Sequence, residues 1–201
     1  IKEDWRKPIH LNDEPTIEQD YSGLHINLLY GLQRLEPQEE PYTIDNLLCF
    51  TDAEQRKIVK GLALMSINTK SPKAAFSAFR QDQQTGSVEK SLKDKLLQRL
   101  LDGFKEKHPA IADSMCTDKG VKLMAVDGRI TARVINHFTK KQIPVLTVHD
   151  SYITPYTHTG ELRRVMNDAV AEELKGFKIN MDQEGVGIDQ LQAFKNMDRT
   201  N

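Results

Sequence analysis

The sequence has few of the features that indicate a particular class of function, such as many cysteines, a strong net charge or long apolar runs. Its 201 residues include only two cysteines, Cys49 and Cys116, and its formal net charge is −1. Two cysteines are too few for a disulfide framework or a cysteine-built zinc site, which makes a reducing compartment the default. The near-neutral charge excludes a globally basic protein, so any site for a polyanion must be a local patch. No apolar run approaches the roughly 20 residues of a membrane helix.

The chain also lacks an initial methionine, a signal-peptide core, internal repeats and low-complexity tracts. It begins IKEDWRKPIHLND, which indicates a piece of a longer protein. With 38% hydrophobic and 28% charged residues, its composition is that of a soluble globular protein. We expect one domain or two closely joined lobes. The expected location is the cytoplasm, or a host-cell compartment if a phage or plasmid carries the gene.

Hydrophobic spacing predicts few strands, placed early and late, around a helical middle third. A strand is expected over 16–20, and two more flank Asp150 in PVLTVHDSYIT (144–154). Helix-capping signals stand at TDAE (51–54) and at SP (71–72). Helices are expected over 23–35, 52–69, 72–81, 88–106, 127–141 and 157–174, and the tail from 189 is expected to be weakly ordered. The predicted fold is therefore α+β, a small antiparallel sheet backed by helices with a helical insertion.

Asp20 is the first candidate site residue, in the stretch EQDYSGLHINLLYG (18–31). A predicted strand ends at this aspartate, Gly23 permits a tight turn, and a predicted helix follows at once. The carboxylate is therefore expected at a strand-to-helix junction, beside exposed backbone groups. The alternative is an aspartate that serves only as a helix cap.

The predicted helix over 52–69 carries a cationic face. Arg56 and Lys60 are four residues apart and Asn68 is eight beyond Lys60, so all three share one side, with Lys57 beside them. Arginine grips phosphate oxygens with two donors, and lysine acts as a point charge. A face that begins with cationic residues and ends with a small polar residue would suit a nucleotide, with the triphosphate at the cations and the ring beside it. A solvated basic face without a ligand is the alternative.

Asp150 follows an apolar strand, within His149-Asp150-Ser151. A buried, unpaired charge is costly, so it is normally found with a counter-charge or a metal. A hairpin turn that merely uses Asp and Ser is the alternative. Asp20 and Asp150 on adjacent strand ends would hold Mg²⁺ through oxygen atoms. Two metals held in this way stabilise the attacking and leaving oxygens of an in-line phosphoryl displacement.

In this order the three patterns resemble motifs A, B and C of template-directed polymerases. The similar families are the family A DNA polymerases and the single-subunit phage-type RNA polymerases. DYSGLH (20–25) is similar to motif A, and RKIVKGLALMSIN (56–68) is similar to motif B, R-x₃-K-x₇-Y. VHDS (148–151) is similar to motif C, where family A usually has HDE and the RNA polymerases HDS. MAVDGRI (124–130) resembles the stretch that precedes motif C, and the resemblance covers about 16–155.

The resemblance implies a palm-like domain from 1–36 and 109–201, with a fingers-like helical subdomain from 37–108. It implies a DNA polymerase-like nucleotidyltransferase that uses Mg²⁺ or Mn²⁺. The implied partners are a nucleic-acid template and primer and nucleoside triphosphates. The implied catalytic residues are Asp20 and Asp150, and the implied metal ligands are Asp20, Tyr21 and Asp150. The implied substrate-binding residues are Arg56 and Lys60 for the triphosphate, His25 and Asn68 for the nucleotide pocket, and His149 near the primer end.

Two positions depart from the family pattern. His25 stands where family A has a glutamate that helps to exclude a ribose 2′-hydroxyl, and where family B has a tyrosine. Asn68 stands where motif B has a tyrosine. These departures leave open a palm-like module that has lost catalysis and binds nucleic acid or a partner protein. They also leave open whether DNA or RNA is made.

A third reading takes His149 and Asp150 as half of an HD-type metal phosphohydrolase. That chemistry needs an upstream histidine and a downstream aspartate as further ligands. The eligible residues in the sequence are His25, His108 and Asp182.

Overall fold

The computed structural model describes residues 5–45 and 50–185, which form two compact units. The sheet unit contains the described residues of 1–22 and 127–201, and the helical unit contains those of 23–126. The sheet is small, antiparallel and accompanied by helices, and the helical unit is inserted between its two chain segments. The α+β class predicted from the sequence is confirmed.

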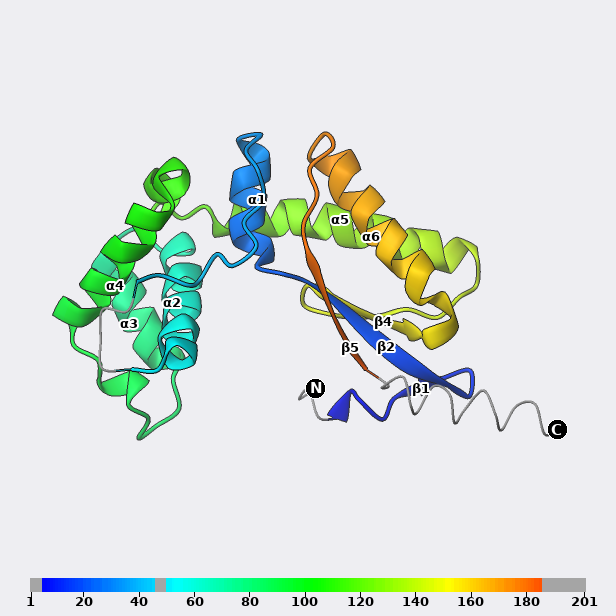
Figure 1. Cartoon of the computed structure of the whole chain (residues 1–201), viewed down its shortest axis with the longest axis horizontal. Coiled ribbons are helices and arrows are strands. Elements are labelled where there is room, and N and C mark those ends of the chain that lie inside the picture. Colours follow the sequence, from blue (N-terminus) through cyan, green and yellow to red (C-terminus); the bar gives the residue numbers. More distant parts are fainter. Residues whose placement is uncertain (1–4, 46–49, 186–201) are drawn as a thin grey trace. The chain divides into compact units, whose positions relative to one another are not determined.

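Strand β2 (Glu14–Tyr21) is central in the sheet (Figure 1). It pairs antiparallel with β4 (Ser151–Pro155) on one side and with β5 (Met181–Gly185) on the other. β3 (Leu146–Val148) pairs with β4, and the short β1 (His10–Leu11) pairs with the start of β2. β1 and β5 were not predicted, because two residues give no periodic pattern and MDQEG contains no β-branched residue.

The two faces of β2 have different surroundings, because successive side chains of a strand point to opposite sides. Ile17, Gln19 and Tyr21 lie on the side of α6 (Thr159–Glu173), where the Tyr21 hydroxyl donates to the Met166 carbonyl oxygen at 2.8 Å. α6 follows the short helix η4 (Tyr156–His158) and buries an apolar stripe that was predicted from its spacing. The other side of β2 carries Glu18 and Asp20.

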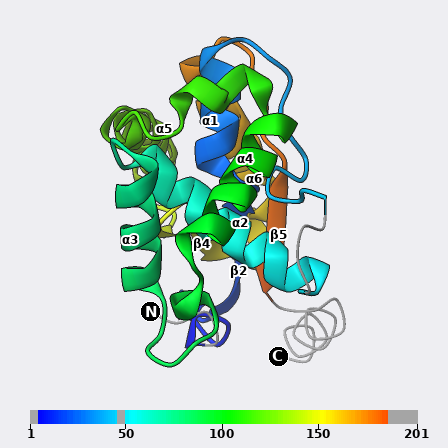
Figure 2. The same cartoon turned by 90° about the vertical axis from the view of Figure 1, so that its left-hand side faces the viewer.

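Before the start of α5 (Gly120–Lys140), the described residues of the helical unit form α-helices and short 3₁₀ segments (Figure 2). They are α1 (Leu24–Leu32), α2 (Asp52–Ile67), α3 (Pro72–Asp82), η2 (Glu89–Ser91), α4 (Asp94–Lys107) and η3 (Pro109–Ser114). Both predicted caps are present: Thr51 and Glu54 form a capping box, and Ser71 accepts from the backbone N–H of Ala74 ahead of α3. α2 packs on α3 and α4.

The predicted helix over 88–106 is wrong in its first turn. The chain leaves helical geometry at Leu92 and Lys93, whose ψ angles are 131° and 152°, so that η2 and α4 are separate. Leu92 turns inward and is buried. Its carbonyl oxygen accepts from Nη1 of Arg80 at 3.1 Å, which replaces the helical hydrogen bond. The helix predicted over 127–141 begins earlier, since α5 covers Gly120–Lys140.

The division between the units differs from the predicted boundaries at 36 and 109. α1 belongs to the helical unit because its polar side chains bond there: Tyr30 Oη lies 2.8 Å from Nδ1 of the buried His108. The other ring nitrogen of His108 lies 2.7 Å from the carbonyl oxygen of Pro41. The second boundary falls within α5, between Val126 and Asp127. The tail from 189 lies outside the described residues. Among the helices of the described part, none has both the length and the apolar character to cross a membrane.

Candidate functional site

The turn that carries Asp150 is a two-residue β-hairpin loop. Val148 pairs with Ser151, which leaves His149 and Asp150 as the loop residues. His149 has φ 54°, a left-handed conformation that favours glycine in the first position of such a loop. His149 therefore adopts a backbone conformation that costs energy for a residue with a side chain and depends on support from the surrounding structure.

Strand register brings Asp20 and Asp150 together. Asp20 in β2 pairs directly with Ser151 in β4, and Asp150 is the residue before Ser151. Paired α-carbons in an antiparallel sheet lie about 5 Å apart, so the α-carbons of the two aspartates are separated by no more than roughly 9 Å. Both residues are half-buried.

The face of the sheet that carries Asp20 is acidic. Directly paired residues have their side chains on the same face, so Asp182 of β5 lies on the same side as Asp20, its pairing partner. Glu184 pairs with Glu18 in the same way. The Ser22 hydroxyl donates to Oδ2 of Asp182 at 2.6 Å. We call this surface the acidic face; it comprises Glu18, Asp20, Ser151, Asp182 and Glu184.

Tyr21 lies on the opposite face, and its side chain belongs to the core. Its ring packs edge-on against Tyr152, with ring centroids 6.2 Å apart. Burial raises the pKa of Tyr21 far above its ordinary value and that of Tyr152 to about 12. The neutral Tyr21 hydroxyl is committed to Met166, so the Tyr21 side chain is not a metal ligand and only its backbone carbonyl could serve.

Arg56 and Lys60 lie on the exposed side of α2, opposite Ile58, Val59 and Leu62, which are buried. Nε of Arg56 is 3.1 Å from a carboxylate oxygen of Glu40. Nζ of Lys60 is 5.9 Å from the ring centroid of Tyr42, a cation–π distance. Both cations are therefore accessible, and both already contact neighbours within the helical unit.

Asn68 forms the C-terminal cap of α2. Its Nδ2 donates to the Leu64 carbonyl oxygen at 2.8 Å. Its Oδ1 lies so close to Gly120 that a β-carbon at that glycine would be 1.7 Å away. Asn68 therefore joins the end of α2 to the start of α5, a structural role that sequence spacing did not reveal.

The remaining predicted residues are both histidines. His25 is half-buried in the first turn of α1, directly after Gly23, whose φ is 61°. The predicted turn at Gly23 is thus present. His149 is exposed in the hairpin loop. The roles predicted for both side chains stay predictions.

Sequence reasoning missed three contributors to the acidic face: Glu18, Glu184, and Asp182 as a neighbour of Asp20. Alternation along EPTIEQDY gave a signal for Glu18, since residues two apart in a strand share a face. Asp182 gave no such signal, because β5 was not predicted.

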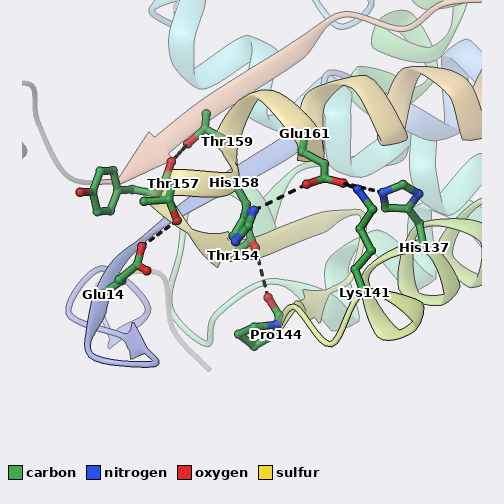
Figure 3. Close-up of polar contacts among 10 residues, drawn as sticks. Glu14, His137, Lys141, Pro144, Thr154, Thr157, His158, Thr159 and Glu161 are labelled. Carbon is green, nitrogen blue, oxygen red and sulfur yellow. Dashed lines mark hydrogen bonds and ion pairs between the residues drawn. The ribbon is translucent and has the colours of Figure 1, made fainter.

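A second polar cluster joins the end of α5 to the start of α6 (Figure 3). Oε1 of Glu161 accepts from Nε2 of His137 at 2.7 Å and from Nζ of Lys141 at 2.5 Å, and Nδ1 of His158 lies 3.6 Å from Oε2. These hydrogen bonds lower the pKa of Glu161 to about 2. The cluster holds two helices together through one carboxylate.

No family model matches the chain, and no curated protein does. Among solved structures, it is similar to the polymerase domain of Pol1 from M. smegmatis, in complex with a DNA primer-template and a dNTP. The TM-score is 0.54 and the identity is 9%, over 89% of this chain and 41% of that one. The fold is polymerase-like. The chain spans less than half the length of that solved chain.

Proposed function

We propose that the chain is the palm-like and fingers-like part of a template-directed nucleic-acid polymerase that resembles DNA polymerases. The observation that carries this proposal is the strand register that puts Asp150 next to the partner of Asp20. The polymerase-like fold supports it, since the chain is similar in overall fold to the polymerase domain of Pol1, with a TM-score of 0.54. In this proposal the partners are a template, a primer and nucleoside triphosphates.

The carboxylate oxygens of Asp20 and Asp150 fit Mg²⁺ or Mn²⁺ as ligands. In the described ranges, 5–45 and 50–185, no group of three or more His, Cys, Asp or Glu side chains is placed to hold a metal. A pair of carboxylates is nevertheless the usual protein contribution for Mg²⁺, which keeps water and takes substrate phosphates as its other ligands. Asp20 and Asp150 would supply that pair, with the Tyr21 carbonyl as a backbone donor.

In the reaction, this chain's residues hold and orient the reacting groups. Asp20 and Asp150 would hold the ions, and a bound ion would supply positive charge against the transferred phosphoryl group. Arg56 and Lys60 bind the triphosphate of the incoming nucleotide, as charge-assisted donors suited to phosphate. His25 and Asn68 line the nucleotide pocket, and His149 lies near the primer end.

Primer extension on the full-length protein tests the proposal. Wild-type protein with Mg²⁺ should add nucleotides to a primer in the order set by the template, with dNTPs and NTPs compared in parallel. Asp20→Asn and Asp150→Asn should each lower the rate by about a thousandfold, the loss expected when several kcal/mol of charge stabilisation disappear. A wild-type protein without template-directed addition would contradict the proposal.

A palm-like binding module without catalysis is the second candidate. The contacts of Arg56 with Glu40 and of Asn68 with Leu64 favour it, since both predicted substrate residues have partners in the protein. In the same assay this module would bind primer-template without extending it. The HD-type phosphohydrolase has less support, because both ring nitrogens of His108 have partners in the core and Asp182 accepts from Ser22.

A further inference from the structure

Glu18 has an unusual position on the acidic face. It lies two residues before Asp20 on the same strand face, and its side chain is only 12% exposed. Nε of Arg6 donates to its Oε2 at 2.8 Å. A carboxylate in such a buried place is costly unless it is paired, and Arg6 supplies the counter-charge.

The hydroxyl of Ser151 connects Glu18 with the hairpin loop. Ser151 Oγ lies within hydrogen-bond distance of Oε1 of Glu18 and of the Val148 carbonyl oxygen, the latter at 2.9 Å. The single hydroxyl proton is shared between these acceptors. Val148 and Ser151 are the two residues that close the loop, and Ser151 is only 5% exposed. The contact therefore lies inside the structure, where water competes little with it.

Arg6, Glu18 and Ser151 thus form a continuous chain of polar contacts from the N-terminal segment to the base of the Asp150 loop. These polar contacts involve both strands that carry the proposed site. Glu18 belongs to the strand of Asp20, and Ser151 is both the pairing partner of Asp20 and the neighbour of Asp150. His149 holds a strained backbone in this loop, which needs such external support to persist.

We propose that Glu18 and Ser151 are positioning residues that fix the separation between the Asp20 and Asp150 carboxylates. This inference rests on the proposed function, because it assigns a task at the proposed metal site. Loss of the Ser151 hydroxyl leaves the register of β2 and β4 intact but releases the loop. The aspartates then hold a divalent ion less well, although neither has been changed.

Two variants and one control test the inference on the full-length protein. Ser151→Ala removes the hydroxyl, and Glu18→Gln removes the charge that Arg6 pairs with. The control is Thr154→Val, which removes a buried hydroxyl from the opposite face of the same strand, where it donates to the Pro144 carbonyl oxygen at 3.1 Å (Figure 3). Mn²⁺ binding is measured by the EPR signal of the free ion, without nucleotide, beside single-turnover primer extension.

Ser151→Ala and Glu18→Gln should each weaken Mn²⁺ binding and slow extension by roughly tenfold or more, as is typical for residues that orient metal ligands. The KM for nucleotide should stay unchanged. Ser151→Thr, which keeps the hydroxyl, should restore both values to within a few-fold of wild type, and Thr154→Val should leave Mn²⁺ binding unchanged. Thermal melting shows whether the Glu18→Gln protein folds poorly. In that case Mn²⁺ binding and extension by Ser151→Ala decide whether the positioning role holds.

Wild-type Mn²⁺ affinity in Ser151→Ala, beside loss of binding in Asp20→Asn and Asp150→Asn, would overturn the positioning role and leave the polymerase proposal intact. Absence of extension by wild type, with Mn²⁺ binding still dependent on Asp20 and Ser151, would overturn the polymerase proposal and leave the positioning role. Mn²⁺ binding that is indifferent to Asp20, Asp150 and Ser151 would overturn both.

Discussion

The two units organise their polar side chains by different means. In the sheet unit, backbone pairing places Asp20 beside Ser151 and Asp182, and side-chain contacts then cross between strands. In the helical unit, Arg56 lies on the exposed side of α2 and Asn68 caps the end of this helix, and each bonds to a nearby residue of its own unit. Strand register thus brings together polar residues from distant parts of the sequence, whereas helix periodicity only relates residues that are close along the chain.

The sharpest test of this difference is Gly120→Ala. A β-carbon there would lie 1.7 Å from Oδ1 of Asn68, so the substitution should destabilise the protein by about 1–3 kcal/mol through overpacking. Denaturant unfolding measures the effect. Gly128→Ala in the same helix is the control: nothing lies within 4 Å of its new methyl group, and it should stabilise the protein by about 1 kcal/mol. The double variant Asn68→Ala/Gly120→Ala should recover much of the loss, and additive losses would contradict the structural role of Asn68.

Lys60→Ala tests whether Lys60 of α2 binds the triphosphate of the nucleotide. Removal of one charged phosphate contact should raise the KM for nucleotide roughly tenfold, with little change in primer-template affinity. Steady-state primer extension measures both. Lys57→Ala is the matched control, since Lys57 is equally exposed but lies beside the proposed face, 3.8 Å from Glu89. Equal effects of the two substitutions would mean that α2 presents only a general basic surface.

His25→Ala examines sugar selection at the start of α1. The glutamate and tyrosine found here in the resembled DNA polymerases crowd the 2′-hydroxyl, and an imidazole is bulky enough to do the same. We therefore expect the variant to accept NTPs several-fold better, while dNTP incorporation changes little. Competition between the two substrates in one extension reaction measures the ratio. An unchanged ratio would make His25 a structural residue and reopen the choice between DNA and RNA.

Lowering the pH should destabilise the two units in different pH ranges. Burial lowers the pKa of His108 below its ordinary 6.5, so the folded helical unit keeps it neutral. The unfolded chain binds a proton there below about pH 6.5, and stability of this unit should fall as the pH drops below that value. Glu161 of the sheet unit has a pKa of about 2 instead of 4.5. Its stabilising contribution should be complete above pH 4.5 and disappear between 4.5 and 2.

Hydrogen exchange, corrected for its intrinsic pH dependence, resolves the two units by peptide. Peptides of α1 and η3 should lose protection between pH 6.5 and 5, while those of α5 and α6 keep theirs until lower pH. His108→Gln should remove the first transition, and Glu161→Gln should weaken the second. Simultaneous loss of protection in both units would show that they unfold as one.

Much of the fold could be predicted because local rules govern it. TDAE gave the capping box of α2, and SP gave the start of α3. The helix over 88–106 was predicted to start too early, because the break at Leu92 involves a contact with Arg80, which lies on another helix. β5 was missed since its residues have low strand propensity, and only pairing with β2 makes it a strand.

The sequence by itself determined the α+β class, the starts of α2 and α3 and the two strands that end near Asp20 and Asp150. These depend on side-chain periodicity and capping, which are properties of neighbours along the chain. Only the tertiary structure decided that Ser151 pairs with Asp20, that Glu18 contacts both Arg6 and Ser151, and that Asn68 packs on Gly120. Those contacts join residues tens of positions apart or on separate elements, and no local propensity specifies which pairs will meet when the core closes.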